Sequence, residues 1–313
     1  MIYFLYDELF LKHETGEFHP ENPQRLISIY TRLRSRGIFE NVIKLKPEKI
    51  NYESLKNVHD PLYIKKVEEE CRKGYSLLST GDTDICSSSN DVALYAAGGV
   101  LKTLDKIFNS EIKRGFCSIR PPGHHASADI GMGFCIYNNI ALAAEHAKSN
   151  YNIEKIMIID WDVHHGNGTQ DIFYGDNSVL FVSTHQSPLY PGTGSSTEKG
   201  MGPGKGFTIN IPMKKGTGND DIISVFNEII MPAAKEFKPE LTLISAGFDS
   251  RKDDPLGGFL IDDDGFRKLT RMVIEISEYS GSGKILSILE GGYNYDGLSS
   301  AVFSHMDEMI SGS

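Results

Sequence analysis

The sequence predicts an α/β protein whose core is a mainly parallel β-sheet with helices on both faces. Short runs rich in Val and Ile alternate with segments of helical spacing along the whole chain, and strand–helix–strand order is typical of parallel sheets. Polar residues cluster directly after several of these runs, where parallel α/β sheets carry their sites. Neither a repeat nor a low-complexity linker divides the 313 residues, so we expect one domain over residues 1–313.

The predicted strands are short apolar runs bounded by turn residues. They are Ile2–Tyr6, Phe116–Ile119, Lys155–Asp160, Val179–Ser183, Phe207–Ile211, Leu241–Ser245 and Ile285–Leu289. The segments between them have apolar residues at helical spacing. They are Pro23–Arg36, Asn90–Phe108, Asn138–Lys148, Asn219–Phe237, Asp263–Tyr279 and a C-terminal stretch from Gly297.

Composition excludes several classes of protein. Hydrophobic residues make up 40% and charged residues 24%, as in ordinary soluble chains. The formal charge of −10 opposes nucleic-acid binding; it would favour cationic partners, although solubility alone explains it equally well. We expect neither a signal peptide nor a membrane span, because the required apolar stretches are missing. No CxxC spacing occurs among the four cysteines, which are Cys71, Cys86, Cys117 and Cys135. We therefore expect buried free thiols, and free thiols fit the reducing environment of a cytoplasmic protein.

Histidine, aspartate and tyrosine residues gather at the ends of four predicted strands. RPPGHHA follows Phe116–Ile119, WDVHHGNG follows Lys155–Asp160, AGFD follows Leu241–Ser245, and EGGY follows Ile285–Leu289. Six of the ten histidines lie between positions 124 and 185. One such histidine pair is readily a structural pair, whereas two pairs beside strand-end carboxylates and glycines indicate a chemical site.

Three of these residues are candidate metal ligands. Residues two apart on an extended chain point to the same side, so Asp162 and His164 can bind one ion. Asp249, at another strand end, can supply the third ligand. Such a set with an open position suits catalytic zinc, although carboxylate-rich sites also accept iron or manganese. Because two carboxylates nearly cancel the charge of the ion, the bound water needs a separate general base.

The tandem histidines His124 and His125 are the candidate bases. A neutral imidazole can take a proton from the metal-bound water, and its neighbour can later protonate the leaving amine. Each ring needs a partner on its second nitrogen. Asp160 lies on the same side of the strand as Asp162 and roughly 7 Å deeper, which places it as one partner. Asn167 is the candidate for the other.

Tyr293 is the candidate for binding the substrate carbonyl. Gly291 and Gly292 precede it, and glycines let a loop approach a substrate closely. A phenol aimed at the carbonyl oxygen would stabilise the oxyanion of a tetrahedral intermediate together with the metal. Considered alone, a tyrosine after two glycines is more often a turn residue packed on the surface.

Together these motifs resemble the histone deacetylase family. RPPGHHA, DWDVHHGNGTQ, FVSTHQ, YPGTG, NIP, SAGFDS, DPLGG and EGGYN occur in the order found in histone deacetylases and their bacterial relatives, and HPENPQR and GDTD…AAGGV match as well. The resemblance spans roughly residues 13–300. It implies an arginase–deacetylase fold with a mainly parallel eight-stranded sheet, forming a single histone deacetylase-like catalytic domain.

The resemblance implies the same zinc ligands and proton-transfer residues as the spacing does: Asp162, His164 and Asp249, with His124, His125, Asp160 and Tyr293. It adds a narrow substrate tunnel walled by Phe134, which follows Gly133, and by Tyr190. Arg25 would lie near an inner channel through which the acid product leaves. Phe134 as plain core and Arg25 as a surface residue are the alternatives.

The family also implies bound potassium. One ion under the zinc would be held by Asp160, Asp162, His164, Ser183 and Thr184. A second site would use backbone oxygens near Phe173, Asp176 and Val179. Four further histidines stay outside the implied chemistry: His165 is expected to be structural, His185 to bond near the metal loop, and His13 and His19 to lie at the rim or on a solvated loop.

Three positions indicate a branch of the family. Asn167 stands where the first histone deacetylase class has Asp, as in the second class and the bacterial amidohydrolases. It removes a negative charge near His125, so that histidine should be less easily protonated. Val163 replaces the Tyr usual in acetylpolyamine amidohydrolases. Leu256 stands where relatives that prefer polyamines commonly carry an acidic residue.

The sequence therefore predicts a zinc-dependent deacylase that hydrolyses an acetylated amine, such as an acetyl-lysine peptide, to acetate and a free amine. Oligomerisation is compatible with this prediction. Two alternatives stay open: an acetylpolyamine amidohydrolase, and an inactive acyl-lysine binding protein, although a pure binder has no use for a proton shuttle. A manganese ureohydrolase would need carboxylates for two metals, and the sequence offers one catalytic metal set.

Overall fold

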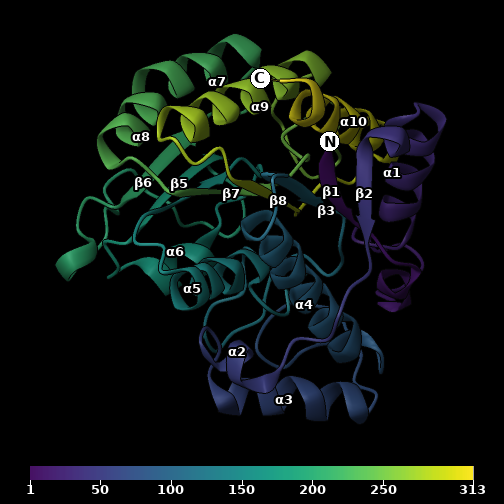
Figure 1. The fold of residues 1–313 in the computed structure, drawn as a ribbon. Helices are drawn as coiled ribbons and strands as arrows, with labels where there is room; N and C mark the ends of the chain where they lie inside the picture. Colours follow the sequence, from purple (N-terminus) through teal and green to yellow (C-terminus); the bar gives the residue numbers. More distant parts are fainter. Residues whose placement is uncertain (313) are drawn as a thin grey trace.

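The computed structural model describes residues 1–312, and within them the chain folds around one eight-stranded sheet (Figure 1). All strand pairs are parallel, in the order β2-β1-β3-β8-β7-β4-β5-β6. The strands are β1 Ile2–Leu5, β2 Val42–Leu45, β3 Arg114–Cys117, β4 Ile156–Asp160, β5 Val179–Gln186, β6 Thr208–Met213, β7 Leu241–Ala246 and β8 Ile285–Leu289. The predicted fold class is confirmed.

Helices cover both faces of the sheet (Figure 1). On one face lie α1 Gln24–Ser35, α7 Asn219–Val225, α8 Met231–Phe237, α9 Asp263–Tyr279 and α10 Tyr295–Ser311. On the other lie α4 Ser89–Phe108, α5 Asn139–Tyr151 and α6 Asn167–Phe173, with α2 Tyr52–Lys56 and α3 Pro61–Arg72 beyond α4. Strands β4, β5, β7 and β8 are buried along their whole length, as expected for a sheet covered on both sides.

Several elements differ from the sequence prediction. Strand β2 was not predicted, because this edge strand pairs only with β1 and is half exposed, so it lacks a continuous apolar run. Helices α2, α3 and α6 were not predicted either. The segment predicted as one helix, Asn219–Phe237, contains a π-helical turn, Phe226–Ile230, between α7 and α8. This turn comes just before Pro232, which has no N–H to continue an α-helical ladder.

His305 of α10 is a fully buried polar residue in the core. Its Nδ1 lies 2.7 Å from Thr270 Oγ1 and its Nε2 lies 2.9 Å from Ser287 Oγ, so it joins α10 to α9 and β8. The ring packs edge-on against Phe116 and Trp161. Burial lowers the pKa of His305 to about 3, which keeps the imidazole neutral in the folded protein.

This histidine should make stability depend on pH. Since its folded pKa lies below the ordinary 6.5, its contribution is fully present above pH 6.5 and is lost as pH falls toward 3. As pH is lowered through this window, the free energy of unfolding of the wild type should decrease. The decrease per pH unit should be smaller in His305→Gln, by about 1.4 kcal/mol, because glutamine takes up no proton on unfolding. Urea unfolding at pH 5, 6 and 7 and equal zinc concentration measures this; equal slopes would contradict it.

The remaining predictions about the whole chain concern cysteines and membranes. All four cysteines lie in the described residues and are free thiols; Cys71, Cys117 and Cys135 are buried, as predicted, whereas Cys86 is partly exposed. Across residues 1–312, no helix combines the length and the apolar character needed to cross a membrane.

Candidate active site

The four strands that end in His, Asp or Tyr motifs are neighbours in the sheet. The order β3-β8-β7-β4 brings RPPGHHA, EGGY, AGFD and WDVHHGNG to one edge. Because all the strands are parallel, their carboxyl ends face the same side and the motifs can converge. The strand-end residues chosen from the sequence are therefore brought together by topology.

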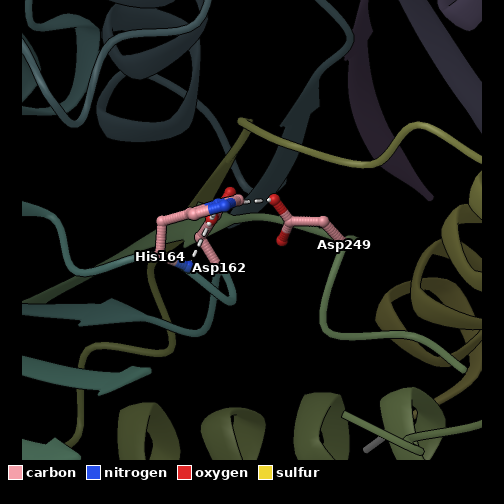
Figure 2. A group of neighbouring side chains, drawn as sticks. All are labelled: Asp162, His164 and Asp249. Atoms are coloured by element: carbon pink, nitrogen blue, oxygen red, sulfur yellow. Dashed lines mark hydrogen bonds and ion pairs between the residues drawn. The ribbon is translucent and has the colours of Figure 1, made fainter. Parts of the chain in front are cut away.

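Asp162, His164 and Asp249 form a compact buried group (Figure 2). Each offers one ligand atom, and these three atoms lie within 4.8 Å of one another. His164 Nδ1 lies 3.0 Å from Asp162 Oδ1 and 3.1 Å from Asp249 Oδ2. Within residues 1–312, this is the one such cluster of His, Cys, Asp and Glu side chains.

The backbone orients both carboxylates toward His164. Gly291 N–H donates to Asp162 Oδ2 (2.9 Å) and Val163 N–H donates to Asp249 Oδ1 (2.8 Å). The opposite oxygen of each carboxylate is the one that faces His164 Nδ1. A Cβ at Gly291 would collide with the carboxylates of Asp162 and Asp249, so glycine is required for this approach.

The group fits a divalent metal ion by its chemistry and its charge. Two carboxylate oxygens and one imidazole nitrogen are suitable ligands for zinc. Burial, together with the charge of Asp162, raises the pKa of Asp249 to about 7, because two buried carboxylates repel each other. A cation held between them would compensate both charges.

The tandem histidines lie beside this group with their ring centroids 4.0 Å apart. His124 Nδ1 lies 2.9 Å from Asp160 Oδ2, and His125 Nδ1 lies 2.8 Å from Asn167 Oδ1. Burial opposes a charge on both rings. The carboxylates of Asp160 and Asp162 outweigh burial and raise the pKa of His124 well above 6.5, whereas burial and neighbouring His124 lower the pKa of His125 well below it.

Tyr293 is nearly buried, with its ring against the guanidinium of Arg25, whose Cζ lies 5.0 Å from the ring centroid. Phe134 packs edge-on against the same ring at 6.0 Å. Burial raises the pKa of Tyr293 well above 10, so its hydroxyl stays protonated and can donate a hydrogen bond.

A cavity of about 280 Å³ leads to these residues. Its lining includes the predicted Gly133, Phe134, Tyr190 and Leu256, together with His125, His164 and Tyr293, and also Asp82 and Leu189, which were not predicted. Phe134 has a φ of 68°, and a Cβ at Gly133 would collide with the His125 ring. The loop that walls the cavity therefore lies directly against the tandem histidines.

Asp82 and His19 support the rim of the cavity. Asp82 Oδ1 accepts hydrogen bonds from Gly133 N–H (2.7 Å) and from the Tyr190 hydroxyl (3.3 Å). His19 packs edge-on against Phe134 at 4.6 Å, and its Nε2 lies 3.2 Å from Asp84. His13 is fully buried, 2.7 Å from Ser89 Oγ, so neither a rim position nor a solvated loop describes it.

Arg25 belongs to a fully buried charged cluster that was not predicted from the sequence. Its Nη1 donates to Glu21 Oε1 (2.9 Å) and its Nε donates to the Gly292 carbonyl (2.7 Å), so Arg25 is not a surface residue of its helix. Arg120 also pairs with Glu21 through both oxygens of that carboxylate. The motifs HPENPQR and RPPGHHA already contained these residues, but their pairing depends on tertiary structure.

Glu290 is a second buried residue that was not predicted from the sequence. Its Oε2 accepts hydrogen bonds from Gly123 N–H (2.7 Å) and His124 N–H (3.2 Å), and its Oε1 accepts one from Ser245 Oγ (3.2 Å). This buried carboxylate joins the loop of the tandem histidines to the Tyr293 loop. Its position at the start of EGGYN, among polar strand-end residues, was the available signal.

The remaining predicted residues lie around this site. Ser183 and Thr184 are buried in β5, and Ser183 is the register partner of Asp160 in β4. His185 lies 3.0 Å from Ser183 Oγ and 2.9 Å from the Gly194 carbonyl. His165 lies 2.8 Å from Thr193 Oγ1, away from the ligand group.

A parallel α/β sheet with this strand-end site defines the arginase–deacetylase class of proteins. Residues 19–309 match the family described as histone deacetylase domain, and the chain belongs to the histone deacetylase family.

Known proteins similar to this chain include deacetylases from archaea and plants. A probable deacetylase of Archaeoglobus fulgidus is 42% identical over 295 residues, covering 94% of this chain and 81% of that protein. Histone deacetylase 5 of Arabidopsis thaliana is 37% identical over 311 residues, covering 94% of this chain and 46% of that protein. The chain thus spans about half the length of the plant relatives it matches.

A solved structure shares the fold over the whole chain. The crystal structure of the HDA15 HD domain has a TM-score of 0.94 and 36% sequence identity, and the match covers 100% of this chain and 89% of that one.

Proposed function

We propose that this protein is a zinc-dependent deacylase that hydrolyses the amide of an acetylated amine, such as acetyl-lysine, to acetate and a free amine. The observation that carries this proposal is the convergence of Asp162, His164 and Asp249; among these residues, His164 lines the same cavity as His125 and Tyr293. Membership of the histone deacetylase family supports it. Residues 1–313 would form the single catalytic domain.

In this proposal, Asp162, His164 and Asp249 hold the zinc. When bound, zinc supplies a Lewis acid for the substrate carbonyl and acidifies a water molecule. A potassium ion near Asp160, Asp162, His164, Ser183 and Thr184 would have a structural role. The adjacency of Asp160 and Ser183 on β4 and β5 supports that placement.

The two histidines divide the proton transfers. His125 Nδ1–H donates to Asn167 Oδ1, so the Nε2 of this neutral ring is free to accept a proton from the attacking water. His124 donates through Nδ1 to Asp160, which favours its charged form. When the amide bond breaks, a protonated histidine returns the proton to the leaving amine.

Tyr293 and the cavity wall position the substrate. The Tyr293 hydroxyl donates to the substrate carbonyl oxygen and stabilises the negative charge that develops there. Phe134 and Tyr190 would contact the extended apolar stem of an acyl-amine in the cavity. Because the two aromatic rings would cover this stem, water would be excluded from the reacting bond.

A turnover panel tests the proposal. The zinc-loaded protein is given acetyl-lysine peptides, acetylputrescine, acetylspermidine and longer acyl-lysines, and release of the free amine is measured. We expect the acetyl-lysine peptides to have the highest kcat/KM. Absence of turnover on every substrate would contradict the deacylase proposal, and a tenfold or greater preference for either polyamine would assign the protein to the polyamine branch.

Leu256 at the cavity rim provides a sharper specificity prediction. An apolar residue offers no partner for a second ammonium group, which would lose hydration there. Leu256→Glu should therefore raise relative activity on acetylspermidine over acetyl-lysine peptide by roughly 3- to 10-fold at low salt, and the gain should shrink as salt rises. Leu260→Glu, which places the same charge on an exposed residue outside the cavity lining, should show no such gain. An equal gain in both variants would show that Leu256 does not select the substrate.

A further inference from the structure

Asp254 is a buried carboxylate to which the proposed reaction assigns no role. Its Oδ2 accepts hydrogen bonds from the backbone N–H of Tyr293 (2.7 Å) and of Asn294 (3.2 Å). Its Oδ1 accepts one from Leu256 N–H (2.9 Å). One side chain therefore fixes both the residue that meets the carbonyl and a residue at the rim.

The loop formed by Gly291, Gly292 and Tyr293 is bound at each of these three residues by a different side chain. Gly291 N–H donates to Asp162, and the Gly292 carbonyl accepts from Arg25 Nε. Gly292 has a φ of 126°, a conformation that glycine adopts readily and other residues rarely do. Asp254 then binds the backbone of Tyr293 itself, where the chain turns toward α10.

We propose that Asp254 is a positioning residue for Tyr293: it fixes the backbone from which the tyrosine hydroxyl reaches the substrate carbonyl. Arg25 and Phe134 contact the ring of Tyr293, whereas Asp254 binds the backbone N–H of the residue that carries this ring. An oxyanion donor is effective only within a narrow range of positions, so its backbone must be fixed as well. This inference rests on the proposed deacylase function.

The chemistry of the carboxylate explains why asparagine cannot replace it. Two oxygens accept three N–H groups here, and a carboxylate is an acceptor on both sides. In Asp254→Asn, one of those oxygens becomes an NH₂ group that faces an N–H donor. Either Leu256 or the Tyr293–Asn294 pair then loses its acceptor, with almost no change in side-chain volume.

The chain offers a matched control next to this residue. Asp253 is exposed, and only its backbone carbonyl contacts the Tyr293 loop, by accepting from Asn294 Nδ2 at 3.0 Å. It has a φ of 68°, which asparagine tolerates as well as aspartate does. Asp253→Asn therefore removes a neighbouring charge and leaves these contacts intact.

The test is a double-mutant cycle with Tyr293→Phe on the zinc-loaded protein. We expect Asp254→Asn to lower kcat by at least about tenfold, up to the roughly 10²–10³ that one oxyanion donor contributes. In the Tyr293→Phe background the same change should alter kcat by less than about threefold, because the group it positions is gone. Asp253→Asn should have no effect in either background.

Two further measurements keep the test decisive. Zinc content should stay at the wild-type level in Asp254→Asn, and hydrogen exchange should accelerate by about tenfold or more at the amides of residues 256, 293 and 294 but not elsewhere. An equal loss of kcat in both backgrounds, loss of zinc, or unchanged exchange at these amides would overturn the inference. A wild-type protein without deacylase activity would instead overturn the proposed function.

Discussion

Asp249→Ala is expected to lose bound zinc and hydrolytic activity together. Asp249 Oδ2 lies 3.1 Å from His164 Nδ1, and the substitution leaves one carboxylate and one imidazole as ligands. Loss of a residue that only supports a ligand lowers metal affinity by about 10- to 100-fold, so removal of a ligand itself should exceed about 100-fold. In the proposed function, the bound zinc would polarise the substrate carbonyl and acidify a water molecule, so turnover should fall to background.

Zinc content measured by mass spectrometry after gel filtration, alongside turnover of an acetyl-lysine peptide, checks this prediction. The removed carboxylate also accepts a hydrogen bond from Val163 N–H, so circular dichroism must show that the variant is folded. Asp129→Ala, which removes an exposed carboxylate from the loop that follows the tandem histidines, is the control and should keep both zinc and activity. One zinc per chain and normal turnover in Asp249→Ala would show that the ligand assignment is wrong.

The ligand group illustrates how far the sequence could predict this site. The spacing of Asp162 and His164 on an extended chain predicted a shared direction, and their ligand atoms do converge. Asp249 could be proposed because it follows another strand, but nothing in a single sequence gives the order of strands. The neighbouring positions of β4 and β7 in the sheet bring it within reach.

Residues that act through backbone N–H groups were harder to predict. Glu290 accepts from Gly123 and His124, and Asp254 accepts from Tyr293 and Asn294, in each case from a loop distant in the chain. Every residue except proline has an N–H group, so the sequence carries no pattern that identifies such a partner. The same limit applies to Glu21, whose role depends on the two arginines that meet it in the core.

Local elements were predicted where the apolar pattern was strong. The fully buried strands β4, β7 and β8 appear within one residue of their predicted bounds. Strand β2 was not predicted because it is an edge strand that pairs with β1 and is partly exposed. An exposed position can hold a charged residue such as Lys44, so the strand has no continuous apolar pattern. Helix α3 begins with Pro61 in its first turn behind the capping side chain of Asp60, a start signal that was overlooked.

Tyr293→Phe should lower kcat by roughly 10²–10³, the usual loss for one oxyanion donor. The substitution removes the hydroxyl but keeps the ring that packs on Arg25 and Phe134, so the fold and the cavity wall should persist. Tyr293 is not among the ligand group, and zinc content should stay at the wild-type level. KM should change little, because the hydroxyl is expected to bind the developing oxyanion more strongly than the substrate carbonyl.

Steady-state kinetics with an acetyl-lysine peptide separate kcat from KM for this variant. Tyr295→Phe is the matched control: its hydroxyl bonds Asn22 Nδ2 at 2.7 Å at the surface, two residues beyond Tyr293, and its loss should leave both constants unchanged. A Tyr293→Phe variant with normal kcat and a raised KM would mean that the tyrosine only binds substrate. If both kcat and KM stayed normal, the Tyr293 hydroxyl would not be the group that stabilises the oxyanion, and another group in the cavity would have to do so.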